Sequence, residues 1–363
     1  RKKQRNEILE RISSGESKII VGTHAMFQAD IAYEKLGLIV IDEQHRFGVS
    51  QRAELKRLGK TSFAEEKLSP HILVMSATPI PRTLSMTLYG DLDVSVIKEK
   101  PANRLPVKTK VVFDSQIEKV YSFIKKEIQS GRQAFIVYPL VEKSEKLEYK
   151  SAVEHFESLK EDVFSEVECG LLHGQMFWYE KEETMKEFLD KKYDILIATT
   201  VIEVGIDIPN ASIMVIEDAE RFGLSQLHQL RGRVGRGAEQ SYCILVTKDK
   251  YKYQLNKNRD EISERKSAII RLKTMEETND GFKIAEVDMK LRGPGDILGT
   301  KQSGMPYYKF LNITEDGNII SEARKQAFAV IEKDPQINRE ENKILKKEYI
   351  KRYGEDKVFF DIA

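Results

Sequence analysis

The sequence predicts an α/β protein with two parallel-sheet lobes followed by a helical carboxy-terminal extension. Short apolar runs rich in Ile, Val and Leu alternate along the chain with segments of helical spacing. The runs show little polar alternation, which is typical of strands that are buried on both faces of a parallel sheet. Polar residues directly follow several runs, at the strand ends where open α/β sheets bind ligands. A length of 363 residues accommodates two or three domains.

The bulk composition excludes several classes of protein. The 59 Lys and Arg residues balance 58 Asp and Glu residues, so any basic binding surface must be local. The two cysteines, Cys169 and Cys243, lie far apart without metal spacing, and the six histidines form no zinc pattern. No signal peptide and no apolar run of roughly 18 residues occur, so we expect a cytoplasmic protein without a membrane partner.

The first predicted lobe covers residues 1–98. Helical spacing predicts a helix over residues 1–17, and three apolar runs predict strands at 18–21, 36–41 and 72–75. Each run ends in a polar group; these groups contain Thr23 and His24, Asp42 and Glu43, and Ser76 and Thr78. We expect these three groups to meet at one edge of the sheet, since ligands sit at the carboxyl ends of parallel strands.

Asp42 and Glu43 are two adjacent carboxylates at the end of an apolar run. Carboxylates at such a position are costly to bury unless they hold a cation or paired donors. Magnesium is usually held by one or two carboxylates together with phosphates, and a neighbouring acid can position an attacking water. A magnesium–nucleotide site fits both residues. An ordinary acidic pair at a strand-to-loop junction is the alternative.

The second predicted lobe covers residues 99–250 and follows a proline-containing linker at 98–106. Its predicted strands are 107–113, 134–138, 170–173, 195–198, 213–216 and 242–246, and its predicted helices are 116–129, 142–165 and 179–189. Strands that alternate with helices in this way indicate a doubly wound sheet.

Two segments of the second lobe carry anion-binding chemistry. Thr199–Asp207 directly follows a strand and offers hydroxyls, Gly205 and a carboxylate, which suit a nucleic-acid backbone or a ribose. Gln229–Arg236 packs three arginines and two glycines into eight residues, and arginine forks pair with phosphate oxygens. Considered alone, the first segment also fits an ordinary turn, and the second also fits a solvated basic turn.

The predicted extension covers residues 251–363. The segment 248–273 carries nine basic residues against four acidic ones, a local net charge of +5 that also suits a solvated helical face. The glycines of Leu291–Gly299 have the spacing GxGxxxG with no preceding strand, which excludes a dinucleotide fingerprint. An amphipathic helix is expected at 321–333.

Taken together and in order, the motifs resemble those of superfamily 2 helicases, which have two RecA-like lobes. The segments "DEQHRFGV", "SATPIPRTL", "LLHGQM", "QLHQLRGRVGRG" and "LRGPGDILGTKQSG" resemble the RecG family of bacterial DNA-junction translocases. The similarity extends to about residue 335. It implies an ATP-dependent helicase of DNA repair and recombination that acts on branched double-stranded DNA such as forks and Holliday junctions. A single-stranded DNA-binding protein is a further candidate partner.

The resemblance also implies residue roles with ATP and Mg²⁺ as cofactors. Asp42 resembles the acid that holds magnesium through water, and Glu43 resembles the general base for the hydrolytic water. Arg233 and Arg236 match arginines that reach the γ-phosphate. Gly205, Asp207 and Gln229 match nucleotide-contacting positions. Positions that contact DNA or couple it to ATP are matched by Thr23, His24, Ser76, Thr78, Thr199, Arg292, Gly293, Gly295 and Gln302.

The chain departs from the family pattern in three places. No phosphate-binding loop GxxxxGK[ST] occurs, and the chain begins at Arg1. We therefore expect a carboxy-terminal fragment that lacks the family's amino-terminal wedge domain, with an incomplete first lobe and no ATPase of its own. Three aromatic residues, Phe177–Trp178–Tyr179, stand where polar residues are expected. The transcription-repair coupling factor shares two of the motifs and remains an alternative, as does a short non-catalytic DNA-binding paralogue.

Overall fold

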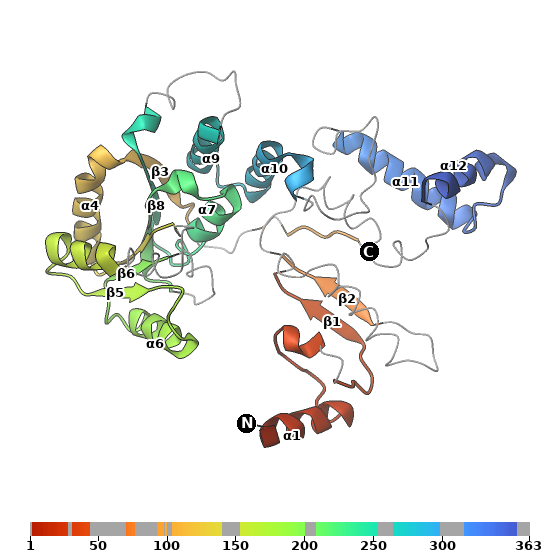
Figure 1. Ribbon diagram of the computed structural model, residues 1–363, viewed down its shortest axis with the longest axis horizontal. Coiled ribbons are helices and arrows are strands. Elements are labelled where there is room, and N and C mark those ends of the chain that lie inside the picture. Colours follow the sequence, from red (N-terminus) through yellow and green to blue (C-terminus); the bar gives the residue numbers. More distant parts are fainter. Residues whose placement is uncertain are drawn as a thin grey trace. The chain divides into compact units, whose positions relative to one another are not determined.

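The computed structural model describes residues 2–27, 31–43, 70–76, 93–97, 99, 104–139, 153–199, 208–252, 264–297 and 316–353. The chain divides into two compact units (Figure 1). Unit 1 contains residues 1–95 and 301–363, and unit 2 contains residues 96–300. The three-part division at residues 98 and 250 stays a prediction.

Unit 2 is built around a six-stranded sheet whose neighbouring strands all pair in parallel. The order across the sheet is β3-β8-β7-β4-β6-β5, so β3 and β5 form its edges. The strands are β3 (Lys108–Phe113), β4 (Gln133–Val137), β5 (Cys169–Leu172), β6 (Ile195–Ala198), β7 (Ala211–Ile216) and β8 (Tyr242–Thr247). The predicted doubly wound parallel sheet is confirmed, and each strand lies within two residues of its predicted bounds.

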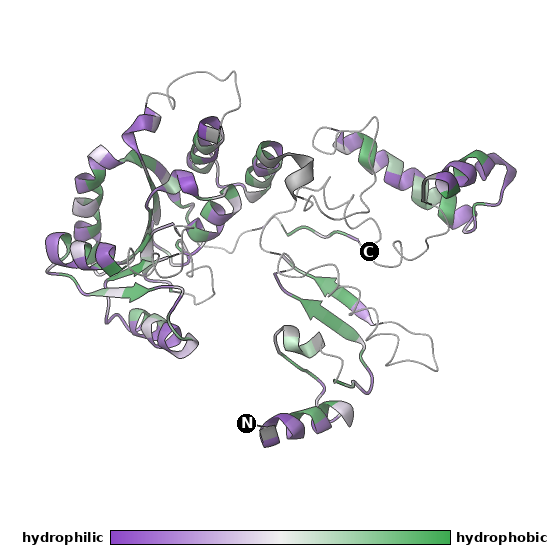
Figure 2. Ribbon diagram, in the orientation of Figure 1, coloured by the Kyte–Doolittle hydropathy of each residue, from purple (hydrophilic) through white to green (hydrophobic). Residues whose placement is uncertain are grey.

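Alternate residues of the central strands face two separate hydrophobic clusters. In β4, Ala134 and Ile136 belong to one cluster, and Phe135 and Val137 belong to the other. All five residues of β4 are buried, which explains why its sequence is a continuous apolar run rather than an alternating one. Figure 2 shows these strands in green between helices whose outer faces are purple.

Helices cover both faces of the sheet, as Figure 1 shows for α4 on one side and α7 and α9 on the other. The first face is covered by α4 (Ile117–Gln129) and by the π-helical turn η4 (Leu159–Val163), which continues a helix over 153–158. The second face is covered by α6 (Trp178–Leu189), α7 (Leu224–Arg231), α9 (Glu264–Glu277) and α10 (Gly281–Ile297). Short 3-10 turns are η3 (Asp114–Gln116), η6 (Ala219–Arg221) and η7 (Asp249–Tyr251).

Helix α9 also lies along the outer edge of the sheet. The Glu276 Oε1 atom accepts a hydrogen bond of 3.1 Å from the backbone N–H of Val111 in edge strand β3. This N–H has no strand neighbour on that side, because β3 pairs only with β8. The helical hairpin of α9 and α10 therefore covers a sheet edge as well as a sheet face.

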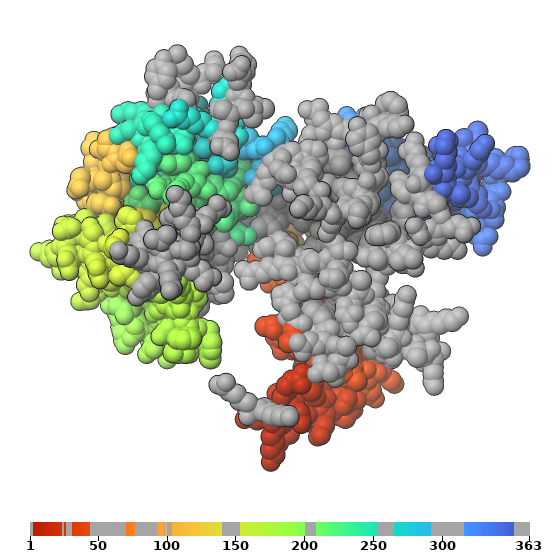
Figure 3. All heavy atoms as spheres, viewed as in Figure 1, coloured from red at the N-terminus to blue at the C-terminus, as the bar shows by residue number. Residues whose placement is uncertain are grey.

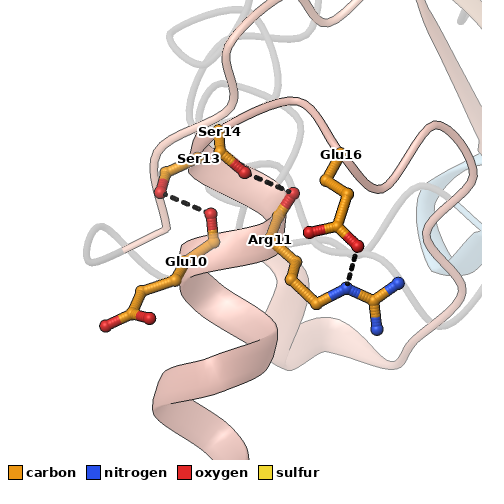
Figure 4. Close-up of polar contacts among 5 residues, drawn as sticks. All are labelled: Glu10, Arg11, Ser13, Ser14 and Glu16. Atoms are coloured by element: carbon orange, nitrogen blue, oxygen red, sulfur yellow. Dashed lines mark hydrogen bonds and ion pairs between the residues drawn. The ribbon is translucent and has the colours of Figure 1, made fainter.

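Unit 1 begins with α1 (Lys2–Ser13), which confirms the helix predicted at 1–17. Its carboxyl end is closed by local contacts (Figure 4). The Ser13 and Ser14 hydroxyls donate to the carbonyls of Glu10 and Arg11, and Arg11 Nε donates to Glu16 Oε1 at 2.9 Å. The Glu10 and Arg11 carbonyls also accept hydrogen bonds from the backbone N–H groups of Ser14 and Ser17, so both have partners at the end of the helix.

Two parallel strands, β1 (Leu38–Ile41) and β2 (His71–Val74), form the sheet of unit 1. Both predicted strands are confirmed, but the expected burial on both faces is wrong, because β1 alternates between exposed and buried residues. The strand predicted at 18–21 is also wrong. That segment is coil and pairs with none of the described strands. Its Ile19 and Val21 are among the most exposed of the described apolar residues, at 87% and 91%.

The carboxy-terminal part of unit 1 contains α11 (Gly317–Lys333), the 3-10 turn η8 (Glu340–Asn342) and α12 (Lys343–Tyr353). Asp334 closes the turn between the helices. Its carboxylate accepts hydrogen bonds from the backbone N–H groups of Asn338 and Arg339 and from the Asn342 side chain. These donors lower the pKa of Asp334 to about 2. Within the described ranges, no helix is both long and apolar enough to cross a lipid bilayer.

Candidate functional site

In unit 1, the acidic pair directly follows β1. Asp42 is exposed, and Glu43 is half-buried with a positive φ of 53°. The Glu43 N–H donates a hydrogen bond of 2.9 Å to Asp42 Oδ1. Left-handed backbone is uncommon for a non-glycine residue and is concentrated at functional sites. The turn therefore leaves the Asp42 carboxylate exposed to solvent, whereas Glu43 is half-buried.

The residues fit a magnesium site of the kind that nucleotides complete. The described ranges contain no group of three or more His, Cys, Asp or Glu side chains that could enclose a metal ion. Magnesium is commonly held by only one or two carboxylates, with water and phosphate oxygens as its other ligands. The exposed carboxylate of Asp42 keeps an oxygen that the turn does not use.

The other site residues predicted in unit 1 lie near β1 and β2 in the sequence. Thr23 is exposed, and its carbonyl accepts a hydrogen bond from the Met26 N–H in the turn η1 (His24–Phe27), which His24 begins. Ser76 is exposed two residues after β2. Thr78, Gly205, Asp207 and Gln302 lie outside the described residues.

In unit 2, the arginine-rich segment Gln229–Arg236 spans the end of α7 and the turn that follows it. Gln229, Arg233 and Arg236 are half-buried, and Arg236 Nε donates to the Gly232 carbonyl at 3.3 Å. Gly235 adopts a φ of +80°, and an added Cβ would lie 2.7 Å from a methyl carbon of Val107. The turn therefore needs glycine here, and its tight course sets the spacing of the two arginines.

Arg231 does not share the environment of the other two arginines. Its side chain is buried, and its guanidinium donates to the carbonyls of Met275 and Thr278 at 2.9 Å each. Burial lowers the pKa of Arg231 from its ordinary value. Arg231 therefore links α7 to the end of α9 and is not available to a phosphate.

The spacing of apolar residues in α7 indicates that the Arg231 side chain points into the core. Arg231 lies seven residues after Leu224 and four after Leu227, and both leucines are fully buried. Residues at these intervals share one face of a helix. The three arginines indicate an anion-binding segment, whereas the leucine periodicity indicates that the first of them, Arg231, points into the core.

The hairpin that Arg231 contacts contains α9 and α10. Leu272 and Met275 of α9 and Ile284 of α10 are buried in the cluster that also contains the leucines of α7. Arg292, Gly293 and Gly295 lie in the last turns of α10. Helices α9 and α10 therefore form a hairpin that packs against the helix that carries the arginine-rich segment.

The carboxyl ends of the central strands of unit 2 hold buried polar groups. Thr199 follows β6, and its hydroxyl oxygen is buried without a hydrogen-bond partner among the described residues. Glu217 follows β7, and its Oε1 is likewise buried without a partner in these ranges. Tyr138 follows β4 and stacks on the His155 ring at 4.8 Å between centroids. The strand-end position predicted for Thr199 is observed, and Glu217 was not singled out in the sequence.

The pKa of Glu217 is raised to about 7. Burial is the largest cause, and the neighbouring carboxylate of Asp218 adds to it, whereas Lys248 opposes it. Lys248 forms an ion pair with Asp218 at 2.7 Å rather than with Glu217. The folded protein therefore favours the neutral form of Glu217.

Replacing Glu217 by glutamine should stabilise the protein above pH 7. A carboxyl with a raised pKa in the folded state costs stability as pH rises from its unfolded pKa of about 4.3 to its folded pKa. The cost is complete above pH 7 and is absent below pH 4. Glu217→Gln removes it, with an expected gain of about 3 kcal/mol at pH 8. Urea unfolding at pH 4.5 and pH 8 measures the difference.

Asp218→Asn is the matched control, since it removes a neighbouring carboxylate that is already paired with Lys248. Asparagine tolerates the left-handed φ of 46° at this position. The control should gain less stability between the two pH values than Glu217→Gln does, because burial, the largest cause of the raised pKa of Glu217, remains. An equal stability of Glu217→Gln and the parent chain at pH 8 would contradict the argument.

Three family models match consecutive parts of the chain. Residues 1–87 match the DEAD/DEAH box helicase model, and residues 115–238 match the helicase conserved C-terminal domain. Residues 278–357 match the model described as ATP-dependent DNA helicase RecG, domain 3, C-terminal.

Curated relatives match almost the whole chain. An ATP-dependent DNA helicase RecG from Synechocystis sp. is 47% identical over 96% of this chain and 39% of its own length. The same named protein from Aquifex aeolicus is 47% identical over 97% of this chain and 42% of its own length. A solved structure of RecG bound to a three-way DNA junction is 42% identical, with a TM-score of 0.61 over 88% of this chain and 38% of that chain. The chain thus spans less than half the length of these relatives.

Proposed function

Because the chain belongs to the RecG family of ATP-dependent DNA helicases, we propose that it forms part of a translocase that uses ATP to move on double-stranded DNA. The intact protein would remodel stalled replication forks and Holliday junctions in DNA recombination and repair. Identity of 42% to a RecG structure bound to a three-way DNA junction supports branched DNA as the substrate. A cytoplasmic location suits a chromosomal DNA substrate, and a single-stranded DNA-binding protein is a further proposed partner.

The observation that carries the proposal is the direct link between the arginine-rich segment and the hairpin of α9 and α10. Arg231 lies two residues before Arg233, and its guanidinium holds the carbonyls of Met275 and Thr278. A change in the conformation of the segment must move or break this contact. A nucleotide that binds the neighbouring arginines can thereby change the position of the hairpin, which we propose contacts DNA.

Each chemical role has a matching side chain in the proposed ATP site. Asp42 would hold Mg²⁺ through water, and Glu43 would orient the hydrolytic water and accept its proton. Magnesium, when bound, would neutralise charge on the phosphates. Arg233 and Arg236 would place two guanidinium groups against the γ-phosphate. The proposed nucleotide contacts are completed by Gly205, Asp207 and Gln229.

A second set of residues is proposed to contact DNA or to couple it to ATP. Threonine and serine hydroxyls suit phosphate and sugar contacts, which fix position without reading sequence. The exposure of Thr23 and Ser76 supports such a role. The full set is Thr23, His24, Ser76, Thr78, Thr199, Arg292, Gly293, Gly295 and Gln302.

A polypeptide of these 363 residues is expected to have no ATPase comparable with that of the full-length protein. Its sequence lacks the GxxxxGK[ST] loop whose amides and lysine surround the phosphates, and electrostatic preorganisation supplies most of such catalysis. Steady-state phosphate release with forked DNA compares the two proteins. The full-length protein should turn over with DNA stimulation, and the polypeptide should not. A full-length protein without DNA-stimulated turnover would contradict the proposed function, and an active polypeptide would contradict this prediction alone.

A further inference from the structure

The amino-terminal end of α6 presents an exposed aromatic surface, here called the aromatic patch, made of Phe177, Trp178 and Tyr179. Their side chains are 64%, 72% and 51% exposed. The Phe177 and Tyr179 rings are stacked within 6° of parallel, and Trp178 meets Tyr179 edge-on. Helix α6 lies on the surface of unit 2 (Figure 3, light green). Contiguous exposed aromatics of this kind mark interaction sites rather than core.

The backbone beneath the patch is held firmly. Glu180 Oε2 accepts a hydrogen bond of 2.7 Å from the Phe177 N–H, and Lys181 Nζ donates to the Gly174 carbonyl at 2.7 Å. Further along α6, Met185 and Phe188 are buried in the core and anchor the helix. The three rings are therefore exposed by the fold and not by fraying of the helix end.

Two carboxylates accompany the exposed rings one helical turn further on. Glu182 lies four residues after Trp178, and Glu183 lies four residues after Tyr179. Residues at this interval are neighbours on a helix surface. Both carboxylates are exposed, and neither forms an ion pair or a hydrogen bond with another described residue, including nearby Lys186. Trp178 and Tyr179 thus each have an exposed carboxylate beside them that forms no ion pair within the described part of the chain.

We propose that the aromatic patch, with Glu182 and Glu183, binds an arginine-bearing segment of a partner protein. A guanidinium prefers the face of Trp or Tyr and pairs with a carboxylate through two parallel hydrogen bonds. An aromatic ring and a carboxylate one turn apart offer both interactions to one side chain. The two ring–carboxylate pairs fit two arginines close together in the partner. This proposal does not depend on the proposed DNA translocase function.

Charge decides against nucleic acid as the occupant. The first two turns of α6 carry Glu180, Glu182 and Glu183 against the single cation Lys181, whose ammonium is directed to the Gly174 carbonyl. Binding of single strands to aromatic platforms depends on lysines and arginines that track the phosphate backbone. Here the groups around the rings repel phosphate and attract a cation.

The chain provides its own probe, because Trp178 is its only tryptophan. The emission of the full 363-residue chain is titrated with a synthetic peptide of alternating arginine, glycine and proline. The control peptide carries neutral citrulline in place of arginine. Saturable binding of the arginine peptide should shift the emission to shorter wavelength, with an affinity at least tenfold above that of the citrulline peptide. The affinity should fall as salt is raised.

Variants locate the binding. Glu182→Gln with Glu183→Gln keeps the tryptophan and should weaken binding of the arginine peptide at least tenfold. Trp178→Ala, followed by anisotropy of a labelled peptide, should do the same. All three side chains are exposed, so circular dichroism should match that of the parent chain. Equal affinity for the two peptides, or binding unaffected by both variants, overturns the proposal. A larger emission change with a thymidine oligonucleotide than with the arginine peptide also overturns it and identifies the patch as a base-stacking surface.

Discussion

Replacing Arg236 by alanine is expected to lower the ATPase turnover of the full-length protein by about three orders of magnitude or more. The proposed role places its guanidinium against the γ-phosphate, where charge develops in the transition state and where positioned donors act most strongly. Its side chain is half-buried in the turn after α7, and its Nε donates to the Gly232 carbonyl at 3.3 Å. We expect the substitution to leave the fold intact. Phosphate release at saturating ATP and forked DNA measures the effect.

Arg221→Ala is a matched control for this experiment. Arg221 is an exposed arginine of unit 2. Its ion pair with Asp218 at 3.9 Å is long and solvent-exposed, so it should contribute little. This variant should retain the parent turnover. An Arg236→Ala protein that retains turnover within a factor of a few, with unchanged DNA binding, would remove Arg236 from the proposed catalytic set.

Replacing Arg231 by alanine is expected to act on the hairpin of α9 and α10 rather than on phosphate. The variant loses two hydrogen bonds from a buried charged donor and leaves the Met275 and Thr278 carbonyls without it. The expected destabilisation is about 3 kcal/mol. Urea unfolding measures the change in the free energy of unfolding of the protein. Hydrogen exchange should show that backbone amides lose protection first over residues 264–297. In the full-length protein, we expect DNA unwinding to be lost more severely than DNA binding.

The Arg236→Ala variant serves here as the control for stability. It removes the same type of side chain from the same segment, but from a half-buried position rather than from a buried one. It should change the free energy of unfolding by less than about 0.5 kcal/mol. If hydrogen exchange over residues 264–297 is unchanged in Arg231→Ala, the contact of Arg231 with the Met275 and Thr278 carbonyls does not couple α7 to the hairpin.

The sheet of unit 2 could be predicted from the sequence because its strands are buried on both faces. The run at 195–198 has the same bounds in the sequence prediction and in the fold, and its four residues are all buried. The run at 18–21 has a similar composition but forms no strand. Apolar composition indicates that a segment can pair, whereas pairing itself depends on a neighbouring strand that a local pattern does not reveal. The charged helix α12 was missed for a related reason, since it has no clear apolar stripe.

The motifs of the candidate site could be recognised in the sequence, but their geometry could not. The acidic pair after β1 and the arginine-rich segment after α7 were recognisable as motifs, and the sequence placed both correctly next to secondary structure. The positive φ of Glu43 has no signal in composition, because glycine or asparagine is the usual residue at such a position. The raised pKa of Glu217 depends on burial by residues distant in sequence, so no local pattern contains it.

The contact between Glu276 and the Val111 N–H has a consequence for how far the hairpin can travel. An uncovered edge strand presents a row of backbone donors and acceptors to other chains and promotes aggregation. A hairpin that swung fully away from β3 during each cycle would create such an edge at every step. In the proposed translocase, small displacements of α9 that keep this edge of the sheet covered are therefore favoured over a single large movement.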